Sequence, residues 1–470
     1  MTFSSLQFLV FFMVITLWFF MLKTQRARIW LLLIGSCYFY MSFIPVYILI
    51  LASIIVIDFF AGIQIGKQEG FQRKLWLIVS LLANVGTLAF FKYCDFFIDT
   101  INHISFFPHG RLPVQLLNIA LPLGLSFHTF QAMSYTIEVY RGNQKPERNF
   151  AVYALYVMYF PQLVAGPIER PQNILHQLRT FIPYNRDNVK EGISRMLWGF
   201  FKKCVIADRF SMVVDTVFAH SGSSSYATLA IGAVFYAFQI YCDFSGYTDI
   251  ALGAARILGI KLMINFDRPF ASRSISEFWR KWHISLYSWF YDYVFNPIVT
   301  ALRNWGKSAI IFGILFIFLL SGFWHGAGWK WIMYGLMNGV AIVYEYLTKK
   351  QRKKIFSRLP VLLNSIISNI ITFAFITFSW IFFRAQDVGS AFKYIGRILK
   401  LQKGSDDIGI NVSEFVFSIC LIIILLVREK YVPGFLIKNN KLHYVYVTMM
   451  IMVCYFFGVF IENQFIYFQF

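Results

Sequence analysis

The chain has 470 residues, of which 58% are hydrophobic and only 14% are charged, and its formal net charge is +20. Soluble domains carry roughly a quarter of charged residues, so this composition excludes an ordinary soluble protein and indicates a polytopic membrane protein. The basic residues cluster in short loops between apolar runs. This pattern is typical of cytoplasmic loops, so the positive charge indicates membrane topology and not nucleic-acid binding.

Apolar runs of membrane-spanning length follow one another along the chain, and we expect about twelve transmembrane helices. The runs cover 5–22, 29–43, 45–66, 75–92, 115–139, 192–218, 226–248, 308–325, 328–347, 361–383, 412–428 and 441–461. Basic residues follow the first run and none precedes it, which predicts a retained span with the N-terminus outside. The basic loops after 45–66, 115–139 and 328–347 then fall on the cytoplasmic side, and the polar stretch 221–225 falls outside.

Two further segments fit no simple span. Tyr153 to Pro167 is apolar but is interrupted by proline and glycine, and Ser274 to Pro297 mixes aromatic with charged residues. Irregular backbone at membrane depth needs protein or a water-filled cavity to receive its polar groups. We therefore predict an all-α polytopic protein, a single domain over 1–470, with two re-entrant or interfacial segments and a cavity open to the cytoplasm.

The six cysteines are scattered, and none has the spacing of a CxxC pair or of a metal site with histidine. We expect small buried hydrophobic residues there and no metal. The sequence lacks a Walker loop, a GxGxxG turn after a strand, a GxSxG elbow and an HExxH helix. P-loop ATPases, Rossmann dehydrogenases, serine hydrolases and zincins are therefore not supported.

Two polar segments within apolar surroundings come first along the chain. In 160–171, proline and glycine free backbone donors that could hold a phosphate or a thioester oxygen, although a plain re-entrant turn explains them equally well. In 239–249, Asp243 and Asp249 are six residues apart and do not share a helix face, so paired-carboxylate catalysis is weakly supported. A polar cavity wall or a wetted helix end is the favoured interpretation.

His283 and His325 are the candidate catalytic residues. His325 lies between two membrane-length runs, where an ionisable side chain is costly and is therefore a functional candidate. Its unperturbed pKa suits a general base near neutral pH, although a helix–helix hydrogen bond is the alternative role. His283 follows Trp279 to Trp282, and an interfacial belt explains these neighbours better than it explains the histidine.

Five motifs in order resemble the membrane-bound O-acyltransferase family, closest to its bacterial branch that acetylates alginate, peptidoglycan and similar polymers. They are FPQLVAGPIERP (160–171), YCDFSGYTDIALG (241–253), FWRKWHISLYSWFYDYVFNPI (278–298), SGFWHGAGWKWIMYGLMNG (321–339) and WIFFRA (380–385). The resemblance extends over most of the chain, from about the third span to 385.

The resemblance implies a bacterial plasma-membrane enzyme with a funnel leading to a buried catalytic histidine, which matches His325, while its second histidine matches His283. It implies acetyl-CoA as donor substrate with no permanently bound cofactor, and an extracytoplasmic SGNH-type partner and polysaccharide acceptor. We expect Arg280, Lys281, Trp282 and Trp324 to contact the donor, the two cations through its phosphates. Positive-inside topology alone is the alternative reason for these cations.

Two other functions stay open on the sequence. A sister branch of the family transfers D-alanine from a carrier-protein thioester, and these motifs do not separate the two donors. A proton-coupled transporter of an envelope precursor, with His325 and Asp243 as relay, is the alternative outside enzymes. Inverted repeats would favour the transporter, and the sequence shows none.

Overall fold

The computed structural model describes residues 1–103, 116–117, 119, 121–163, 166–432, 434–460 and 466. Within these ranges every regular element is a helix, apart from one isolated parallel bridge between Ser224 and Ser405. The all-α expectation is therefore confirmed for the described part of the chain. Residues 115, 118, 120, 164, 165 and 461, which belong to predicted spans or motifs, lie outside it.

The chain divides into two compact units, and the candidate site lies wholly in the second. Unit 1 comprises Met1–Met196, Thr248–Met263 and Leu436–His443, and unit 2 comprises Leu197–Tyr247, Ile264–Phe435 and Tyr444–Phe470. The expectation of a single domain over 1–470 stays a prediction.

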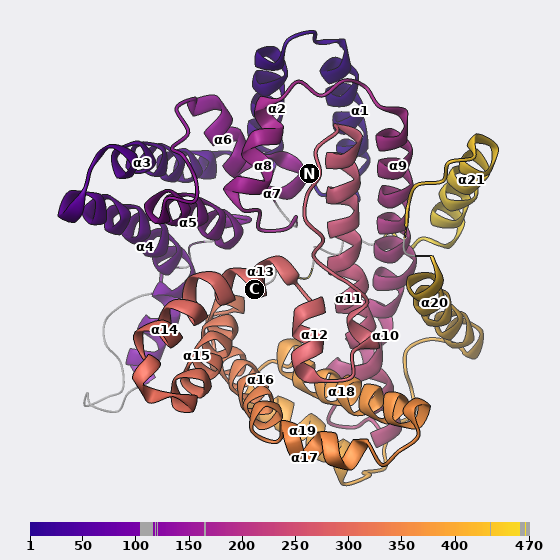
Figure 1. The fold of residues 1–470 in the computed structure, drawn as a ribbon. Helices are drawn as coiled ribbons and strands as arrows, with labels where there is room; N and C mark the ends of the chain where they lie inside the picture. Colours follow the sequence, from indigo (N-terminus) through magenta and orange to yellow (C-terminus); the bar gives the residue numbers. More distant parts are fainter. Residues whose placement is uncertain are drawn as a thin grey trace. The chain divides into compact units, whose positions relative to one another are not determined.

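Unit 1 is built mainly from the N-terminal helices, whose buried polar groups are paired across helices. These are α1 (Leu6–Met21), α2 (Gln25–Met41), α3 (Ile48–Lys67), α4 (Gly70–His103), α5 (Leu125–Arg141), α6 (Phe150–Met158), α7 (Phe160–Leu163) and α8 (Pro171–Arg179), with the first part of α9 (Arg186–Phe200) (Figure 1). Helices α3, α4 and α5 pack on one another. The Asp58 carboxylate accepts hydrogen bonds from Ser80 (2.6 Å) and Asn84 (2.8 Å), which joins α3 to α4.

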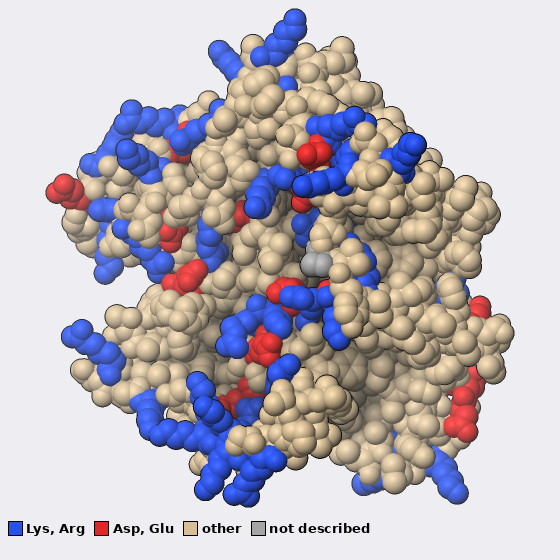
Figure 2. Space-filling view, turned by 45° about the vertical axis from the view of Figure 1, so that its right-hand side comes forward, with Lys and Arg blue, Asp and Glu red and all other residues tan. Residues whose placement is uncertain are grey.

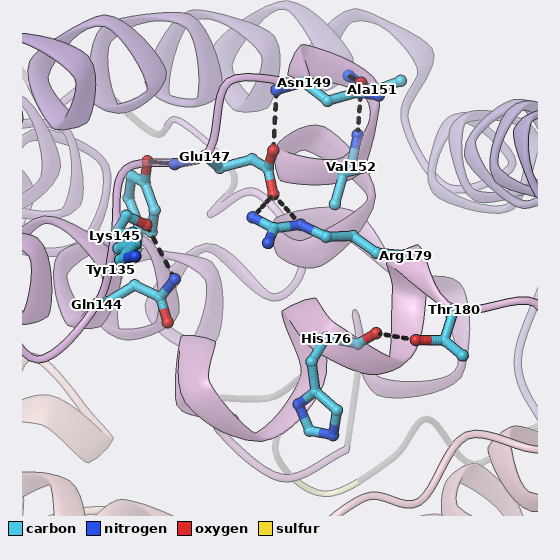
Figure 3. A network of polar contacts seen from close by, with 10 residues as sticks. All are labelled: Tyr135, Gln144, Lys145, Glu147, Asn149, Ala151, Val152, His176, Arg179 and Thr180. Carbon is cyan, nitrogen blue, oxygen red and sulfur yellow. Dashed lines mark hydrogen bonds and ion pairs between the residues drawn. The ribbon is translucent and has the colours of Figure 1, made fainter.

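A polar network fixes the basic loop after α5 (Figure 3). The carboxylate of Glu147, which is only 4% exposed, accepts from Arg179 Nε of α8 and from the backbone N–H of Asn149, each at 2.8 Å. The backbone N–H of Glu147 donates to the Tyr135 hydroxyl of α5 at 2.8 Å. The side chain of Asn149 then caps α6. A buried carboxylate with all these partners is stable, and it ties α5, α6 and α8 together.

Unit 2 contains the later helices. They are η2 (Phe201–Ala207), α10 (Asp208–Ala219), α11 (Tyr226–Ile257), which enters unit 1 from Thr248, α12 (Ile275–Lys281), α13 (Ile284–Phe290), η4 (Tyr291–Phe295), α14 (Asn296–Ala301), α15 (Lys307–His325), α16 (Trp329–Leu347), α17 (Lys349–Phe356), α18 (Val361–Arg384), α19 (Val388–Leu399), α20 (Val412–Tyr431) and most of α21 (Asn440–Phe457) (Figure 1). Helix α16 packs on α15, α12 and α18.

The crossing of α15 and α16 requires glycine at two positions. A Cβ on Gly322 would lie 2.2 Å from the Trp331 carbonyl oxygen, and one on Gly335 would lie 2.3 Å from that of Phe318. Small residues let helices approach closely in a membrane, where packing and not hydrophobic burial drives helix association. The two glycines therefore allow α15 and α16 to approach closely, and His325 lies at the end of α15 near this contact.

In the described part of the chain, each predicted span overlaps at least one helix, with shifted ends. Helix α5 begins at Leu125 and not near 115, and α4 continues to His103, beyond the predicted 92. In the described part of the chain, five helices are long and apolar enough to cross a membrane: Pro45–Lys67, Gly70–Asn102, Tyr226–Ile257, Lys307–His325 and Val361–Arg384. A multi-pass membrane protein is confirmed, and the number twelve stays a prediction.

Both segments that fit no simple span are broken helices. The first is interrupted at Tyr159, between α6 and α7. The second consists of α12, α13, η4 and α14 in succession, and η4 is a π-helix. The segments that the sequence marks by proline or by mixed polarity are thus the segments in which the helix is interrupted.

Candidate active site

A sharp turn between α12 and α13 places His283 in the interior of unit 2. Its φ angle is +46°, in the left-handed region that few non-glycine residues adopt, and its side chain is fully buried. The Ser274 hydroxyl caps the start of α12, and the helix ends with its C-cap at Trp282, whose backbone is extended. Strained backbone of this kind persists only where the surroundings enforce it, and it is common at functional sites.

Asn265 orients His283. The Asn265 side-chain oxygen lies 3.3 Å from His283 Nδ1 and also accepts from the Ser285 backbone N–H (3.1 Å) and hydroxyl (2.9 Å). The Asn265 carbonyl accepts from the Ile284 N–H at 2.9 Å. Because the amide oxygen accepts from Nδ1, the Nε2 side of a neutral ring is the basic one. Burial lowers the pKa of His283 well below its ordinary value, so the ring is neutral at physiological pH.

His325 ends α15 in an aromatic enclosure. Its ring centroid lies 4.9 Å from that of Trp324, 5.0 Å from Phe383 of α18, 6.0 Å from Tyr334 and 6.3 Å from Trp331 of α16. The side chain is 4% exposed. Rings from three helices therefore surround the imidazole, and such a wall excludes bulk water from it.

Trp324 packs against both histidines. Its ring centroid is 6.1 Å from that of His283 and 4.9 Å from that of His325. The structure thus brings together two residues 42 positions apart, one on a turn of a broken segment and one at a helix end. Both predicted catalytic residues share this aromatic site in unit 2, which we call the histidine site.

Helix α12 connects the histidine site to a polar region of the same unit. Glu345, near the end of α16, accepts from the backbone N–H groups of Ile275 and Ser276, each at 2.9 Å. Negative charge stabilises a helix N-terminus, so this contact anchors α12. Farther along α12, Trp279 Nε1 donates to Asn338 of α16 at 3.2 Å.

A basic cavity of about 540 Å³ opens beside the anchored end of α12. Its polar lining includes Arg280, Glu345, Lys349, Arg352 and Lys353. Arg352 is held 3.2 Å from Glu345, while Arg280 and Lys353 are exposed. Lys and Arg gather at the lower end of the face in Figure 2, at the height at which α17 lies in Figure 1. The cavity can accept a phosphate-sized anion through charge-assisted hydrogen bonds.

The four residues predicted to contact the donor lie in different surroundings. Arg280 lines the basic cavity, whereas Lys281 is paired with Glu277 at 2.7 Å one helical turn away. Trp282 is buried, with its ring 4.7 Å from that of Trp380, and Trp324 belongs to the histidine site. Of the two cations predicted to bind phosphate, Arg280 is better placed to bind an anion in the cavity, because Lys281 is already paired with Glu277.

Two other polar candidates are already partnered. Asp243 is 2% exposed, lies 2.7 Å from Lys203 Nζ and accepts from the Ile466 backbone N–H at 2.8 Å. Asp243 therefore forms a buried ion pair inside α11 and is not at a wetted helix end, which is one of the two interpretations that the sequence favours. In the motif 160–171, the Phe160 N–H donates to Ser36 (3.1 Å) and the Gly166 N–H donates to the Gln162 carbonyl (3.0 Å). These two donors are not available to a ligand.

Sequence reasoning missed Asn265, Glu345 and the cations of α17 as parts of the site. Glu345 is the only carboxylate in the run 328–347, and that isolation could have marked it. Asn265 lies in a segment with no distinguishing pattern. Its role depends on a contact across 18 residues that only the fold creates.

The comparisons with known proteins identify the family of the chain. The model of the membrane-bound O-acyltransferase family matches residues 144–386, which include both histidines and α12. The probable alginate O-acetylase AlgI of Pseudomonas aeruginosa is 36% identical over 84% of this chain and 74% of its own length. The peptidoglycan O-acetyltransferase of Helicobacter pylori is 34% identical over 78% and 73%, respectively. The teichoic acid D-alanyltransferase of Streptococcus thermophilus is 33% identical over 51% and 60%. The chain belongs to the membrane-bound O-acyltransferase family, and it is an O-acyltransferase.

Proposed function

We propose that this protein takes an acetyl group from cytoplasmic acetyl-CoA and delivers it across the membrane toward an extracytoplasmic polysaccharide, directly or through an SGNH-type partner. The observation that carries the proposal is the contact of the Trp324 ring with both His325 and His283, with α12 leading from this site to the basic cavity. A buried catalytic group inside the protein, with an anion-binding cavity at the far end of α12, suits a donor and an acceptor that lie on opposite sides of the membrane.

In the proposed reaction His325 is the general base. It takes the proton of the attacking hydroxyl as the hydroxyl oxygen bonds to the thioester carbonyl carbon. The C–S bond then breaks, and the proton passes from the imidazolium to the departing thiolate, so that an ester and a free thiol result. The aromatic wall keeps water, the competing nucleophile, from the thioester.

His283 is assigned a positioning role. Its Nδ1 is directed at Asn265 and its ring packs against Trp324, so it holds the wall that faces His325 and can orient the donor through Nε2. Arg280 and Lys353 at the basic cavity are assigned to the donor's phosphates. Along α16, Glu345 and Tyr334 are eleven residues apart, or about 17 Å at 1.5 Å per residue, so an extended thioester arm can join the two regions.

The chain's similarity to teichoic acid D-alanyltransferases supports a second donor, a D-alanyl thioester on a carrier protein. The two donors are separated by offering the purified protein, in proteoliposomes, either labelled acetyl-CoA or a D-alanyl carrier and measuring thiol release. Turnover of acetyl-CoA alone is expected. If only the D-alanyl carrier is turned over, the carrier thioester and not acetyl-CoA is the donor. If neither is turned over when a polysaccharide or partner is present, acyl transfer from these two donors is contradicted.

The direction of transfer is tested by labelling. Residues Lys350 of α17 and Lys403, which follows α19, are exposed, and replacement by cysteine lets a membrane-impermeant maleimide report their side. We expect Lys350→Cys to react only in opened cells and Lys403→Cys to react in intact cells, with the unsubstituted chain as background. Labelling of Lys350→Cys in intact cells would reverse the direction.

A further inference from the structure

We infer that a second cavity in unit 2 binds a segment of an acidic glycan, the acceptor polymer. This outer cavity has a volume of about 590 Å³ and lies between the loop after α10 and helix α19. Lys393, Arg397 and Lys400 line it together with Phe392 and Gln402, and none of the described lining residues is acidic. This inference rests on the proposed function, which places the polysaccharide acceptor on the extracytoplasmic side.

The rim of the outer cavity is fixed by the backbone. The N–H of Ser225 donates to the Ser405 carbonyl (2.8 Å), and the N–H of Ser405 donates to the Ser223 carbonyl (2.9 Å). The Tyr226 N–H donates to the Gln402 carbonyl (2.9 Å). Segments nearly 180 residues apart are thus joined before any ligand arrives, and a preformed site loses less entropy on binding.

Side chains of α19 complete this frame. Arg397 Nη2 donates to the Ser224 carbonyl at 2.8 Å, and the Tyr394 hydroxyl donates to the Leu229 carbonyl at 2.7 Å. Arg397 is therefore anchored at one nitrogen while the guanidinium keeps further donors for a carboxylate. Lys393 and Lys400 are exposed.

The charge of α19 has no explanation in membrane topology. The segment 393–403 carries four basic residues and no acidic residue. In the predicted topology it follows α18 on the outer side, where positive charge is not favoured for orientation. Lys393, Arg397 and Lys400 follow one another at intervals of four and three residues, so they share one face of the helix. A row of cations one turn apart suits a linear polyanion.

The outer cavity lies at the histidine end of α18. Asn364 and Ser368, near the start of α18, line the basic cavity, whereas Phe383 contacts His325 near its other end. The 24 residues of α18 measure about 36 Å, which is roughly the thickness of the hydrocarbon core. Lys330 of α16 donates to the Ala385 carbonyl at 2.7 Å, directly before α19. Donor-side and acceptor-side cavities thus occupy opposite ends of one helix.

A glycan fits this cavity better than an acidic protein does. Stable protein interfaces bury about 800 Å² on each partner, mostly on flat surfaces, whereas a concave site of several hundred cubic ångströms encloses groups of ligand size. Phe392, which is 51% exposed, adds an apolar face beside the cations. An apolar face next to carboxylate-binding groups matches the mixed surface of an acidic sugar.

The test is equilibrium binding to the purified full chain without donor. Three probes of equal length are compared: an oligouronate, its carboxyl-reduced neutral form and an acidic peptide of equal charge. We expect the oligouronate to bind, the neutral form to bind at least tenfold more weakly, and affinity to fall with added salt. If the acidic peptide binds as tightly as the oligouronate, the assignment of a glycan ligand is wrong and a protein ligand is favoured.

Two variants locate the site. Lys393→Gln with Lys400→Gln removes two exposed cations of the lining, and Lys403→Gln removes an exposed neighbour outside the lining. We expect the first to raise the Kd at least tenfold and the second to leave it within twofold. No change in the first variant would overturn the site.

Failure here is distinguishable from failure of the proposed function. Thioester turnover of donor with a small alcohol does not need the outer cavity, and it should be unchanged in the Lys393→Gln, Lys400→Gln variant. If the wild-type protein turns over donor but binds no oligouronate, this inference is wrong and the proposed function stands. If it binds oligouronate but turns over no donor, the proposed function is wrong.

Discussion

The histidine site and the basic cavity lie in one unit, yet they have opposite physical character. Rings enclose His325 and His283, and both imidazoles are nearly inaccessible to solvent. The basic cavity is open and lined by exposed cations of α12 and α17. A dry aromatic site favours proton transfer without competing water, whereas an open basic one attracts anions. Under the proposed function, the chain would capture a charged donor in one site and carry out the chemistry on its thioester in the other.

The largest effect is expected at His325. Replacement by alanine removes the base, so acyl transfer should fall about 10²–10⁴-fold while membrane insertion is kept. Turnover by purified protein in proteoliposomes measures this, with His220→Ala, an exposed histidine of the same unit, as control. Turnover at the wild-type rate would show that His325 is not the base, and the histidine site could then no longer be contrasted with the basic cavity as the site of the reaction.

A smaller loss is expected at His283. A misplaced reacting group costs up to about 100-fold, so His283→Ala should lower kcat by about 10–100-fold. Asn265→Ala removes the oxygen that orients the ring and should give a loss in the same direction, with kcat changed more than KM. If both variants keep the wild-type kcat and KM, His283 serves only the interfacial belt.

The basic cavity should govern donor affinity and not the chemical step. A charge-assisted hydrogen bond contributes about 1.5–3 kcal/mol, so Arg280→Gln with Lys353→Gln, which removes two such donors, should raise the donor KM about 100-fold or more at unchanged kcat and weaken its salt dependence. Lys350→Gln with Lys354→Gln changes the same charge on α17 outside the cavity and serves as control.

Equal KM in the two double variants would mean that these cations serve topology alone. Lys281→Gln should have less effect than Arg280→Gln, because Lys281 is already paired with Glu277.

The smallest effect is expected outside both sites, at Glu169 in unit 1. Burial raises its pKa from 4.5 to about 7, against the opposing effects of the Met263 N–H and the Asn173 side chain. A raised pKa means that its contribution to stability is complete below pH 4.5 and is lost as pH rises through 7. Between pH 5 and 8 the Tm should therefore fall more in the wild type than in Glu169→Gln, by roughly 2–4 °C for each kcal/mol.

Glu69→Gln, which alters an exposed carboxylate of the same unit, should behave as the wild type in this melting series. Identical pH dependence in all three proteins would show that Glu169 is ionised throughout this range.

The sequence alone determined the membrane class, the helical spans, the broken character of 274–297 and the family. These properties depend on local composition: apolar length decides what can span, and proline, glycine and mixed polarity decide where a helix is interrupted. The five motifs also marked His283 and His325 without any knowledge of their geometry. The family match and the similar O-acetyltransferases confirm the enzyme class, while the roles of the individual residues stay predictions.

Only the tertiary structure decided which of the marked residues share a site. Trp324 contacts two histidines that are 42 residues apart, Asn265 orients His283, and Asp243 is paired with Lys203. It also distinguished Arg280 from Lys281, which are adjacent and chemically similar in sequence, because one lines a cavity and the other meets Glu277. Such contacts arise from helix crossings, and crossings depend on close approach at positions such as Gly322 and Gly335. No local pattern encodes them, because each requires two distant segments to occupy one place.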